Sequence, residues 1–381
     1  MLQKFLDKKP LYYDEIDYQR MPNIYEKIKY RLKLPKIIHL IGTNGKGTTG
    51  RFLASALYKE GFHIGHYSSP HIVDFNERIW IDDNDVTDAQ LEVGHKKLLT
   101  FLSQDDANSL SYFEYTTLLA IVMFEGLDYV VLEAGLGGEY DATSVFEKTL
   151  TLVTPIGIDH EAFLGDTLEQ IATTKLNAIQ NIAILSQQPN SEVYTIAQNI
   201  EIEKKVKIFK VEEFLESDDY IKIETISKNL ALAPYLIQNL KLAISALKFL
   251  EIKYDIENFQ ASKLFGRLTS FNKNILLDVG HNILASQAIV NSCKDEKYIL
   301  IYNSYKDKNY KEIVKILKPI IKSVEIIEID DTRIEKKSLL VETISELGLD
   351  VSSFIKIVED EKYLVFGSFK VVEEFLKMYN E

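Results

Sequence analysis

The sequence predicts an α/β protein of two domains, each built on a parallel or mostly parallel sheet. The 381 residues are enough for two domains that each bury a core of their own. Short β-branched apolar runs alternate with segments of helical periodicity in both halves of the chain. Between the halves, Ser262–Asn274 loses this periodicity. We therefore expect domains at 1–262 and 274–381, joined by a linker at 263–273.

The first half begins with a strand, a glycine-rich turn and a helix. Lys36–Ile41 is an apolar β-branched run typical of a buried strand, and Arg51–Glu60 carries apolar residues at helical spacing. GTNGKGTT lies between them, so we expect a P-loop-type domain with a mostly parallel sheet. Further strands are expected at Phe62–Tyr67, Asp128–Glu133, Leu150–Thr154 and Ile182–Leu185, and helices at Phe113–Glu125, Leu168–Lys175 and Tyr235–Leu250.

The rest of the chain contains one ambiguous region and then a second alternating series. Val206–Lys228 holds short apolar runs broken by acidic residues, which predict one or two strands. After the linker, the alternation predicts a smaller Rossmann-like α/β domain. Its strands are expected at Ile275–Val279, Tyr298–Tyr302, Val324–Ile329 and Tyr363–Phe366, and its helices at Leu284–Cys293, Tyr310–Leu317, Ser338–Leu347 and Lys370–Met378.

The composition of the chain indicates which kinds of partner and which cellular compartment to expect. Lys and Arg number 44 and Asp and Glu 57, and the resulting net charge of −13 argues against nucleic acid or an anionic membrane as the main partner. Cys293 is the only cysteine, which excludes an internal disulfide and a cysteine metal cluster. The N-terminus lacks the apolar segment of a signal peptide, and the longest apolar stretch, Leu118–Phe124, is too short to span a bilayer. We expect a cytoplasmic monomer that acts on small molecules.

The segment GTNGKGT is the strongest indication of chemistry. Backbone N–H groups of a glycine turn before a helix point at a bound phosphate. Lys46 would place positive charge on the β/γ oxygens, and Thr48 would supply a hydroxyl at the phosphate and metal end. The spacing is shorter than the general P-loop pattern, because two residues separate Gly42 from Gly45. A glycine-rich turn with an incidental lysine is the weaker interpretation, given the flanking strand and helix.

Other polar residues follow strands at their carboxyl ends, where open parallel sheets bind ligands. Glu133 ends the strand DYVVLE before a glycine-rich segment, where a carboxylate beside a phosphate loop suits Mg²⁺; alone it reads as a surface glutamate. His160 follows LTLVTPIGID and is a candidate metal ligand, and Ser69 in SSPH follows a third strand. In the second half, Asp278–Asn282 (DVGHN) is equally compatible with a cleft site and a helix cap.

Several segments together match one family. They are GTNGKGTT, SPH followed by FNERI, YFEYTT, VLEAGLGGEYDAT, TPIGIDHEAFLGDTLEQIA, DVGHN, KDK and VFGSFK. In kind and in order over nearly the whole chain, they resemble those of the folylpolyglutamate synthase and dihydrofolate synthase enzymes of the Mur ligase superfamily. The resemblance implies an ADP-forming acid–amino-acid ligase. A pteroate or folate carboxylate would attack the γ-phosphate of MgATP, and the amine of glutamate would displace phosphate. Dihydropteroate, tetrahydrofolate or both remain open as acceptors.

The same resemblance implies roles for individual residues. The phosphates of ATP would be held by Thr43, Asn44, Gly45, Lys46, Gly47 and Thr48, and the rest of the nucleotide by Asn239, Arg267, Asp278 and His281. Two Mg²⁺ ions would be held by Ser69, Glu133 and His160. The pterin would lie near Tyr112, Phe113, Tyr140 and Asp141. Lys46, His160 and Lys175 would act in catalysis.

Lys175 matches a family lysine that CO₂ converts into a carbamate near the second metal. The match is incomplete, because Thr174 stands where the family has a glutamate and Leu176–Asn177 replaces small residues. The resemblance therefore implies a carbamylated Lys175 with a departure in its surroundings.

Two other functions remain as alternatives. A nucleotide-gated P-loop ATPase or binding protein would turn over ATP without glutamate or folate, whereas DVGHN and KDK favour a complete ligase. A cell-wall Mur-type amino acid ligase would carry an additional N-terminal domain for a UDP sugar. The phosphate loop here begins at Gly42, which disfavours that reading.

Overall fold

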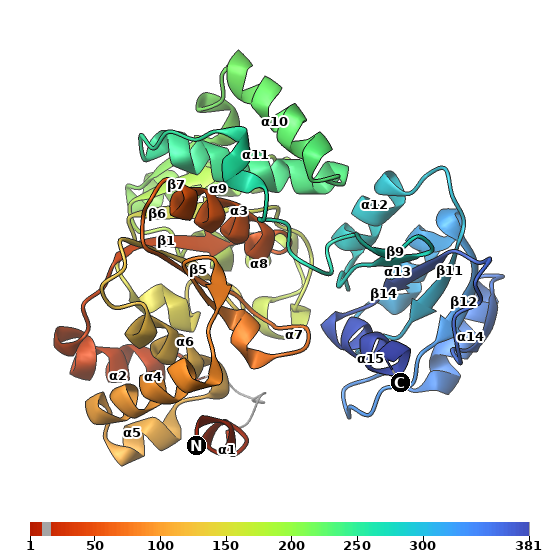
Figure 1. The fold of residues 1–381 in the computed structure, drawn as a ribbon, viewed down its shortest axis with the longest axis horizontal. Coiled ribbons are helices and arrows are strands. Elements are labelled where there is room, and N and C mark those ends of the chain that lie inside the picture. Colours follow the sequence, from red (N-terminus) through yellow and green to blue (C-terminus); the bar gives the residue numbers. More distant parts are fainter. Residues whose placement is uncertain (10–16, 381) are drawn as a thin grey trace.

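The computed structural model describes residues 1–9 and 17–380, which form two α/β lobes lying side by side (Figure 1). Among these residues the strands form one sheet of eight strands and one of six. The predicted fold class, α/β with mostly parallel sheets in two parts of the chain, is confirmed. No helix in the described part of the chain is long and apolar enough to cross a membrane.

The larger sheet has the order β4-β3-β2-β5-β1-β6-β7-β8. Its neighbours from β2 to β8 are parallel, and β3 and β4 add an antiparallel edge. The strands are β1 (Lys36–Ile41), β2 (Ile64–Tyr67), β3 (Ile79–Ile81), β4 (Asn84–Asp85), β5 (Tyr129–Glu133), β6 (Leu150–Val153), β7 (Ile182–Leu185) and β8 (Lys207–Lys210). The carboxyl ends of the parallel strands therefore share one edge, where the predicted site residues follow them.

Helices cover both faces of this sheet (Figure 1). Ile37 and Ile38 point to opposite faces and are both buried, Ile37 in a core with Leu118 and Ile38 in a core with Leu240. Burial on both faces explains why KIIHLI is apolar throughout. The helices are α1 (Leu2–Leu6), α2 (Arg20–Ile28), α3 (Lys46–Lys59), α4 (Asp88–Phe101), α5 (Gln104–Ser109), α6 (Tyr112–Met123), α7 (Glu161–Leu164), α8 (Leu168–Leu176), α9 (Glu192–Lys204), α10 (Ser217–Asn229) and α11 (Pro234–Phe249).

The smaller sheet has the order β13-β12-β11-β14-β10-β9 and is parallel except for β9. Its elements are β9 (Thr269–Asn272), β10 (Ile275–Leu277), α12 (Ile283–Ser292), β11 (Tyr298–Tyr302), α13 (Tyr310–Leu317), β12 (Ile321–Ile326), α14 (Lys337–Glu346), β13 (Asp350–Ser353), β14 (Tyr363–Phe366) and α15 (Phe369–Asn380). Strand β9 lies inside the predicted linker 263–273 and pairs with β10, so this part of the connection belongs to the second sheet.

Three sequence predictions of elements were wrong. Helix α3 begins at Lys46 rather than Arg51, because its first turn contains the glycines and threonines of the phosphate loop. Within Val206–Lys228 one strand forms as β8, but the second half is the helix α10. Its buried Ile223 and Ile226 lie three residues apart on one side, and the polar residues around them conceal the periodicity. Strand β12 begins at Ile321 instead of Val324, directly after a short 3₁₀ turn.

Candidate functional site

The phosphate loop requires glycine at two positions. Gly42 and Gly45 have φ values of +132° and +92°, in the region that favours glycine. A Cβ on Gly42 would lie 2.1 Å from Thr154 Oγ1, and one on Gly45 would lie 2.4 Å from Asn239 Oδ1. The loop thus packs tightly between α11 and Thr154, the residue that follows β6. This packing places Asn239, one of the predicted nucleotide residues, directly against the loop.

Lys46, Glu133 and Ser69 converge beside this loop. Lys46 Nζ lies 3.7 Å from Glu133 Oε1 and donates to the carbonyl oxygens of Gly42 and Thr43, each at 3.3 Å. Glu133 ends β5, and its Oε2 accepts a hydrogen bond from Ser69 N at 3.2 Å. Burial raises the pKa of the Glu133 carboxyl, and the charge of Lys46 opposes that shift. A carboxylate and an ammonium are thus held together at the edge where the strands end.

The groups at this edge fit a phosphate with a divalent ion. The Thr48 hydroxyl is buried without a hydrogen-bond partner in the described structure, although buried hydroxyls are normally satisfied. A Cβ on Gly47 would lie 3.2 Å from Glu133 Oε2, so a larger residue at this position would press against the carboxylate. Among residues 1–9 and 17–380, no group of three or more His, Cys, Asp or Glu is arranged so that it could hold a metal ion by itself. A hard ion such as Mg²⁺ would therefore complete its shell with phosphate and water oxygens.

Lys175 lies beneath the phosphate loop. It is buried near the end of α8, and its Nζ donates to Gly42 O at 3.2 Å. Burial, reinforced by the nearby charge of Lys46, lowers the pKa of Lys175 to about 7. A Cβ on Gly138 would lie 2.6 Å from Lys175 O, so the glycine-rich segment after β5 also packs here. A substantial fraction of Lys175 is accordingly a neutral amine at pH 7.

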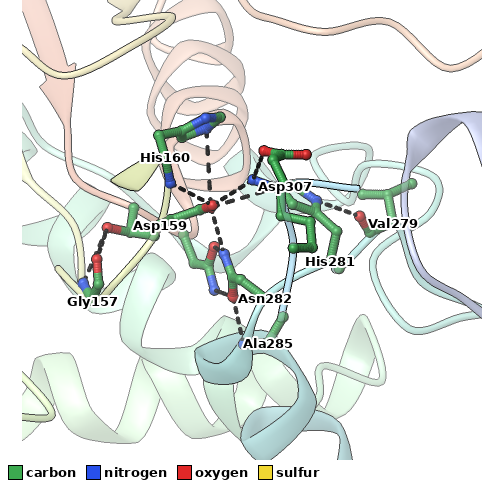
Figure 2. A network of polar contacts seen from close by, with 12 residues as sticks. Gly157, Asp159, His160, Val279, His281, Asn282, Ala285 and Asp307 are labelled. Atoms are coloured by element: carbon green, nitrogen blue, oxygen red, sulfur yellow. Dashed lines mark hydrogen bonds and ion pairs between the residues drawn. The ribbon is translucent and has the colours of Figure 1, made fainter. Parts of the chain in front are cut away.

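Figure 2 shows Asp159 at the centre of a polar network between the two lobes. Its Oδ1 accepts from Lys308 Nζ at 2.6 Å, and its Oδ2 accepts from Asn282 Nδ2 at 2.9 Å. His281 Nε2 lies 3.7 Å from the same Oδ2. Burial alone would raise the pKa of the Asp159 carboxyl, but His281, His160 and Lys308 hold it well below its usual range. Asp159 is therefore a buried carboxylate that gathers groups from the second lobe.

His160 lies beside this network at the start of α7. Its backbone is left-handed, with φ of +56°, and its Nε2 is 4.0 Å from Asp159 Oδ2. Burial lowers the pKa of His160 to about 4, so the imidazole is neutral at physiological pH. Neutral imidazole is the form that ligates metals, which agrees with the predicted role.

Asn282 connects the second lobe to the phosphate loop. Its side chain exchanges two hydrogen bonds with the side chain of Asn44, both at 2.9 Å. Its Oδ1 also accepts from Ala285 N and caps α12. The helix-cap interpretation of DVGHN is thus confirmed, and the capping residue also reaches the loop, while the cleft-site interpretation stays a prediction.

Of the remaining nucleotide candidates, Asp278 contacts the linker and Arg267 lies within it. The Asp278 carboxylate accepts from Tyr235 OH at 2.7 Å and from two backbone N–H groups at 2.8 Å. The guanidinium of Arg267 stacks 5.1 Å from the ring of Phe369, and His281 Nδ1 lies 3.1 Å from Val279 O. The predicted contacts of Asp278, Arg267 and His281 with a nucleotide stay predictions.

The predicted acceptor residues lie around the segment that follows β5. Phe113 packs against Gly135, where a Cβ would lie 2.6 Å from its ring, and Tyr112 precedes it at the start of α6. Tyr140 is 55% exposed. Asp141 is buried and accepts from three backbone N–H groups at 2.9 Å, including that of Gly135. Asp141 thus stabilises the loop, and the roles of the four residues toward a pterin stay predictions.

Sequence reasoning assigned no role to three residues that the structure places at or near this site. Asp159 and Lys308 lie 149 residues apart in the chain, and both were quoted only within motifs. Arg78 of FNERI is buried close to Tyr112. For Asp159 and Lys308 the available signal was a charged residue in a segment that follows a strand end, whereas Arg78 lies directly before β3.

Comparisons with known proteins agree with this geometry. No family model matches the chain. The crystal structure of Helicobacter pylori folylpolyglutamate synthetase is 37% identical, with a TM-score of 0.80, covering 100% of this chain and 98% of that one. A dihydrofolate synthase/folylpolyglutamate synthase of Haemophilus influenzae is 28% identical over 421 aligned positions, 97% of this chain and 95% of its own length. A bifunctional enzyme from Yersinia pestis, crystallised with AMPPNP and Mn, shares the fold with a TM-score of 0.79 at 22% identity, covering 95% and 93% of the chains.

Proposed function

The chain belongs to the folylpolyglutamate synthase/dihydrofolate synthase family, and we propose that it joins L-glutamate to dihydropteroate and to reduced folates at the expense of ATP. It is an ADP-forming acid–amino-acid ligase that uses ATP and a divalent metal. The observation that carries the proposal is the convergence of the phosphate loop, Glu133 and the Asp159 network at the junction of the lobes. Neither the ATPase nor the cell-wall ligase alternative is supported by the relatives.

The reaction runs in two steps that the site suits. A carboxylate oxygen of the acceptor bonds to the γ-phosphorus of ATP while the bond from γ-phosphorus to the ADP oxygen breaks. The free amine of glutamate then attacks the acyl carbon, loses a proton, and phosphate leaves. Lys46 neutralises charge on the transferring phosphoryl group, and the backbone of the loop positions it. The amine must be unprotonated, so turnover should rise toward mildly alkaline pH.

We further propose that Ser69 and Glu133 hold one Mg²⁺, and that Glu133 and His160 hold a second. When bound, such ions screen the acceptor carboxylate from the phosphate oxygens. The neutral imidazole of His160 and the position of Glu133 support this assignment. Lys175, with its pKa near 7, has the free amine that addition of CO₂ requires, which supports a carbamate at this position.

The finer assignments of the site are also proposals. The nucleotide would be held by Thr43, Asn44, Gly45, Gly47, Thr48, Asn239, Arg267, Asp278 and His281. The acceptor would lie against Tyr112, Phe113, Tyr140 and Asp141. Both lobes of a single chain supply these groups, which supports a monomer whose domains, 1–262 and 274–381, enclose the substrates between them.

Supplying the protein with MgATP and labelled glutamate tests the proposed function. One reaction contains dihydropteroate, a second contains tetrahydrofolate, and a third contains neither. Labelled product and ADP should form together in the first two reactions and be absent from the third. ADP release without an acceptor, and no labelled product with either one, would identify an ATPase instead.

A further inference from the structure

Arg78 is a buried cation that forms no ion pair with a carboxylate among the residues that the structure describes. It ends the 3₁₀ turn η2 (Phe75–Arg78) and is 8% exposed, less than any other arginine among the described residues. Its Nε donates to His71 Nδ1 at 2.8 Å. The ion pairs that arginines form with carboxylates in residues 1–9 and 17–380 involve other arginines. Burying an unpaired charge is costly, so a missing anion is expected here.

The buried lysines show how this chain satisfies other buried cations. Lys308 pairs with Asp159, while Lys9 and Lys148 each donate to backbone carbonyl oxygens. Arg78 has neither kind of acceptor in the structure as described. The nearest carboxylate in sequence, Glu77, accepts instead from three backbone N–H groups of the preceding loop at 2.7–2.8 Å. The loop is thereby fixed, and Glu77 is not available to neutralise its neighbour.

The guanidinium lies between the two halves of the proposed site. It stacks 5.4 Å from the ring centroid of Tyr112 and 5.9 Å from that of Phe75. On the other side, burial raises the pKa of the Glu133 carboxyl, and the positive charge of Arg78 opposes that rise. Arg78 therefore stands where the end of an acceptor bound near Tyr112 would approach the phosphate loop.

We propose that Arg78 binds the reacting carboxylate of the pteroyl or folyl acceptor, an inference that rests on the proposed function. A planar guanidinium matches a carboxylate with two parallel hydrogen bonds and fixes its orientation. Bound in this way, one carboxylate oxygen attacks the γ-phosphorus while Arg78 offsets the repulsion between the two anions. The bond to ADP breaks in the same step, and Arg78 keeps its proton throughout. The remaining carboxylate oxygen stays against the guanidinium as the carbonyl of the acyl phosphate.

The experiment compares dihydropteroate with its carboxamide, which has the same shape without the charge. Affinities are measured by calorimetry with Mg²⁺ and AMPPNP present, so that no turnover occurs. The wild type should bind the acid about ten-fold or more tightly than the amide. Arg78→Gln should weaken binding of the acid by about 10- to 100-fold relative to the wild type. Its affinity for the amide should stay within about two-fold of the wild-type value. Arg78→Lys, which keeps the charge but loses the planar fork, should give an intermediate ratio.

The controls separate this role from a structural one. Arg31→Gln removes an exposed arginine that donates to Thr100 O, and it should leave both affinities unchanged. Equal weakening of acid and amide in Arg78→Gln, or an unchanged ratio, would overturn the proposal. If Arg78→Gln does not fold, Arg78→Lys is used instead. A ratio of acid to amide affinity equal to that of the wild type in Arg78→Lys would then overturn the proposal. Wild-type product formation is measured in parallel. Absence of product refutes the proposed function. Product formation together with an unchanged ratio of acid to amide affinity in Arg78→Gln refutes only the proposed role of Arg78.

Discussion

Single charges placed at strand ends determine what the site can do. Lys46 is the only charged residue within Gly42–Thr48, and its ammonium lies between loop carbonyls and Glu133. Its removal would leave Glu133 buried without this counter-charge. We expect chemistry to depend more strongly on Lys46 than folding does, because its side chain is 13% exposed and its ammonium stands 3.7 Å from Glu133.

Lys46→Ala should abolish ligation with either acceptor while leaving the protein folded. Loss of one preorganised charge at a developing phosphoryl transition state costs about 10²-fold or more in kcat. Product formation and thermal unfolding are measured together. Lys59→Ala, in the last turn of the same helix and paired with Asp83 at the surface, is the matched control and should keep full activity. Unchanged turnover in Lys46→Ala would remove this residue from the mechanism.

Lys175 provides a pH-dependent prediction. Its pKa is lowered to about 7 from an ordinary value of 10.5, so the neutral amine that reacts with CO₂ increases as pH rises through 7. With ¹³C-labelled bicarbonate, a carbamate signal should appear in the wild type, grow over this pH range, and be absent from Lys175→Ala. The variant should lose activity, and added bicarbonate should not restore it. A fully active variant would contradict the carbamate.

At the scale of elements, the phosphate loop is held by packing as well as by hydrogen bonds. Gly42 lies so close to Thr154, the residue after β6, that a Cβ would lie 2.7 Å from its carbonyl oxygen. Gly61, just after α3, also has a positive φ, +90° against +132° for Gly42, but nothing lies within 4 Å of its Cβ position. An added Cβ meets a positive φ at both positions but a steric clash only at Gly42.

Gly42→Ala should therefore lower the free energy of unfolding more than Gly61→Ala. Conformational strain alone costs about 1–3 kcal/mol, and only Gly42→Ala adds displacement of the loop. Urea unfolding and AMPPNP affinity are measured for both variants. Nucleotide affinity should fall for Gly42→Ala alone. Equal losses of stability with unchanged affinity in both would show that contact with Thr154 does not position the loop.

The sequence predicted the bounds of strands well where the residues form a continuous apolar run. Continuous apolar runs fixed β7, β11 and β14 at the predicted bounds, because buried parallel strands leave little choice of residue. The helix α10 was missed because its few apolar positions are separated by acidic and basic residues. Its burial comes from packing against α11, which local periodicity does not reveal.

The site was predictable to the extent that its chemistry is local. The phosphate loop was found because glycine turn, lysine and helix are contiguous. The Asp159 network was not, since its partners come from separate strand ends and meet only when the lobes pack (Figure 2). Arg78 was likewise not predicted, because its candidacy rests on its burial without an ion pair among the described residues. Sequence spacing does not reveal such an absence.

At the scale of the whole molecule, the second lobe reaches the site through few side chains. Asn282 contacts the phosphate loop and Lys308 contacts Asp159, whose neighbour His160 is a proposed metal ligand. The side chains of Lys308 and Asp159 are 7% and 5% exposed. Solvent screening is weak at such burial, so this pair holds the lobes together at the place where substrates would bind.

Lys308→Met should loosen the lobes and slow turnover without unfolding either of them. Removing one partner of a buried ion pair costs about 3–5 kcal/mol, and the bond from Asn282 that Asp159 keeps reduces the expected loss below that range. Small-angle scattering with AMPPNP and Mg²⁺ should show a larger radius of gyration than the wild type. Because misplaced reacting groups slow a positioned reaction, kcat should fall about ten-fold or more. Lys311→Met, which removes an exposed pair with Glu346 in the same lobe, should change stability by less than about 0.5 kcal/mol and leave both readouts intact. An unchanged radius and kcat in Lys308→Met would mean that the lobes are held in place by other contacts.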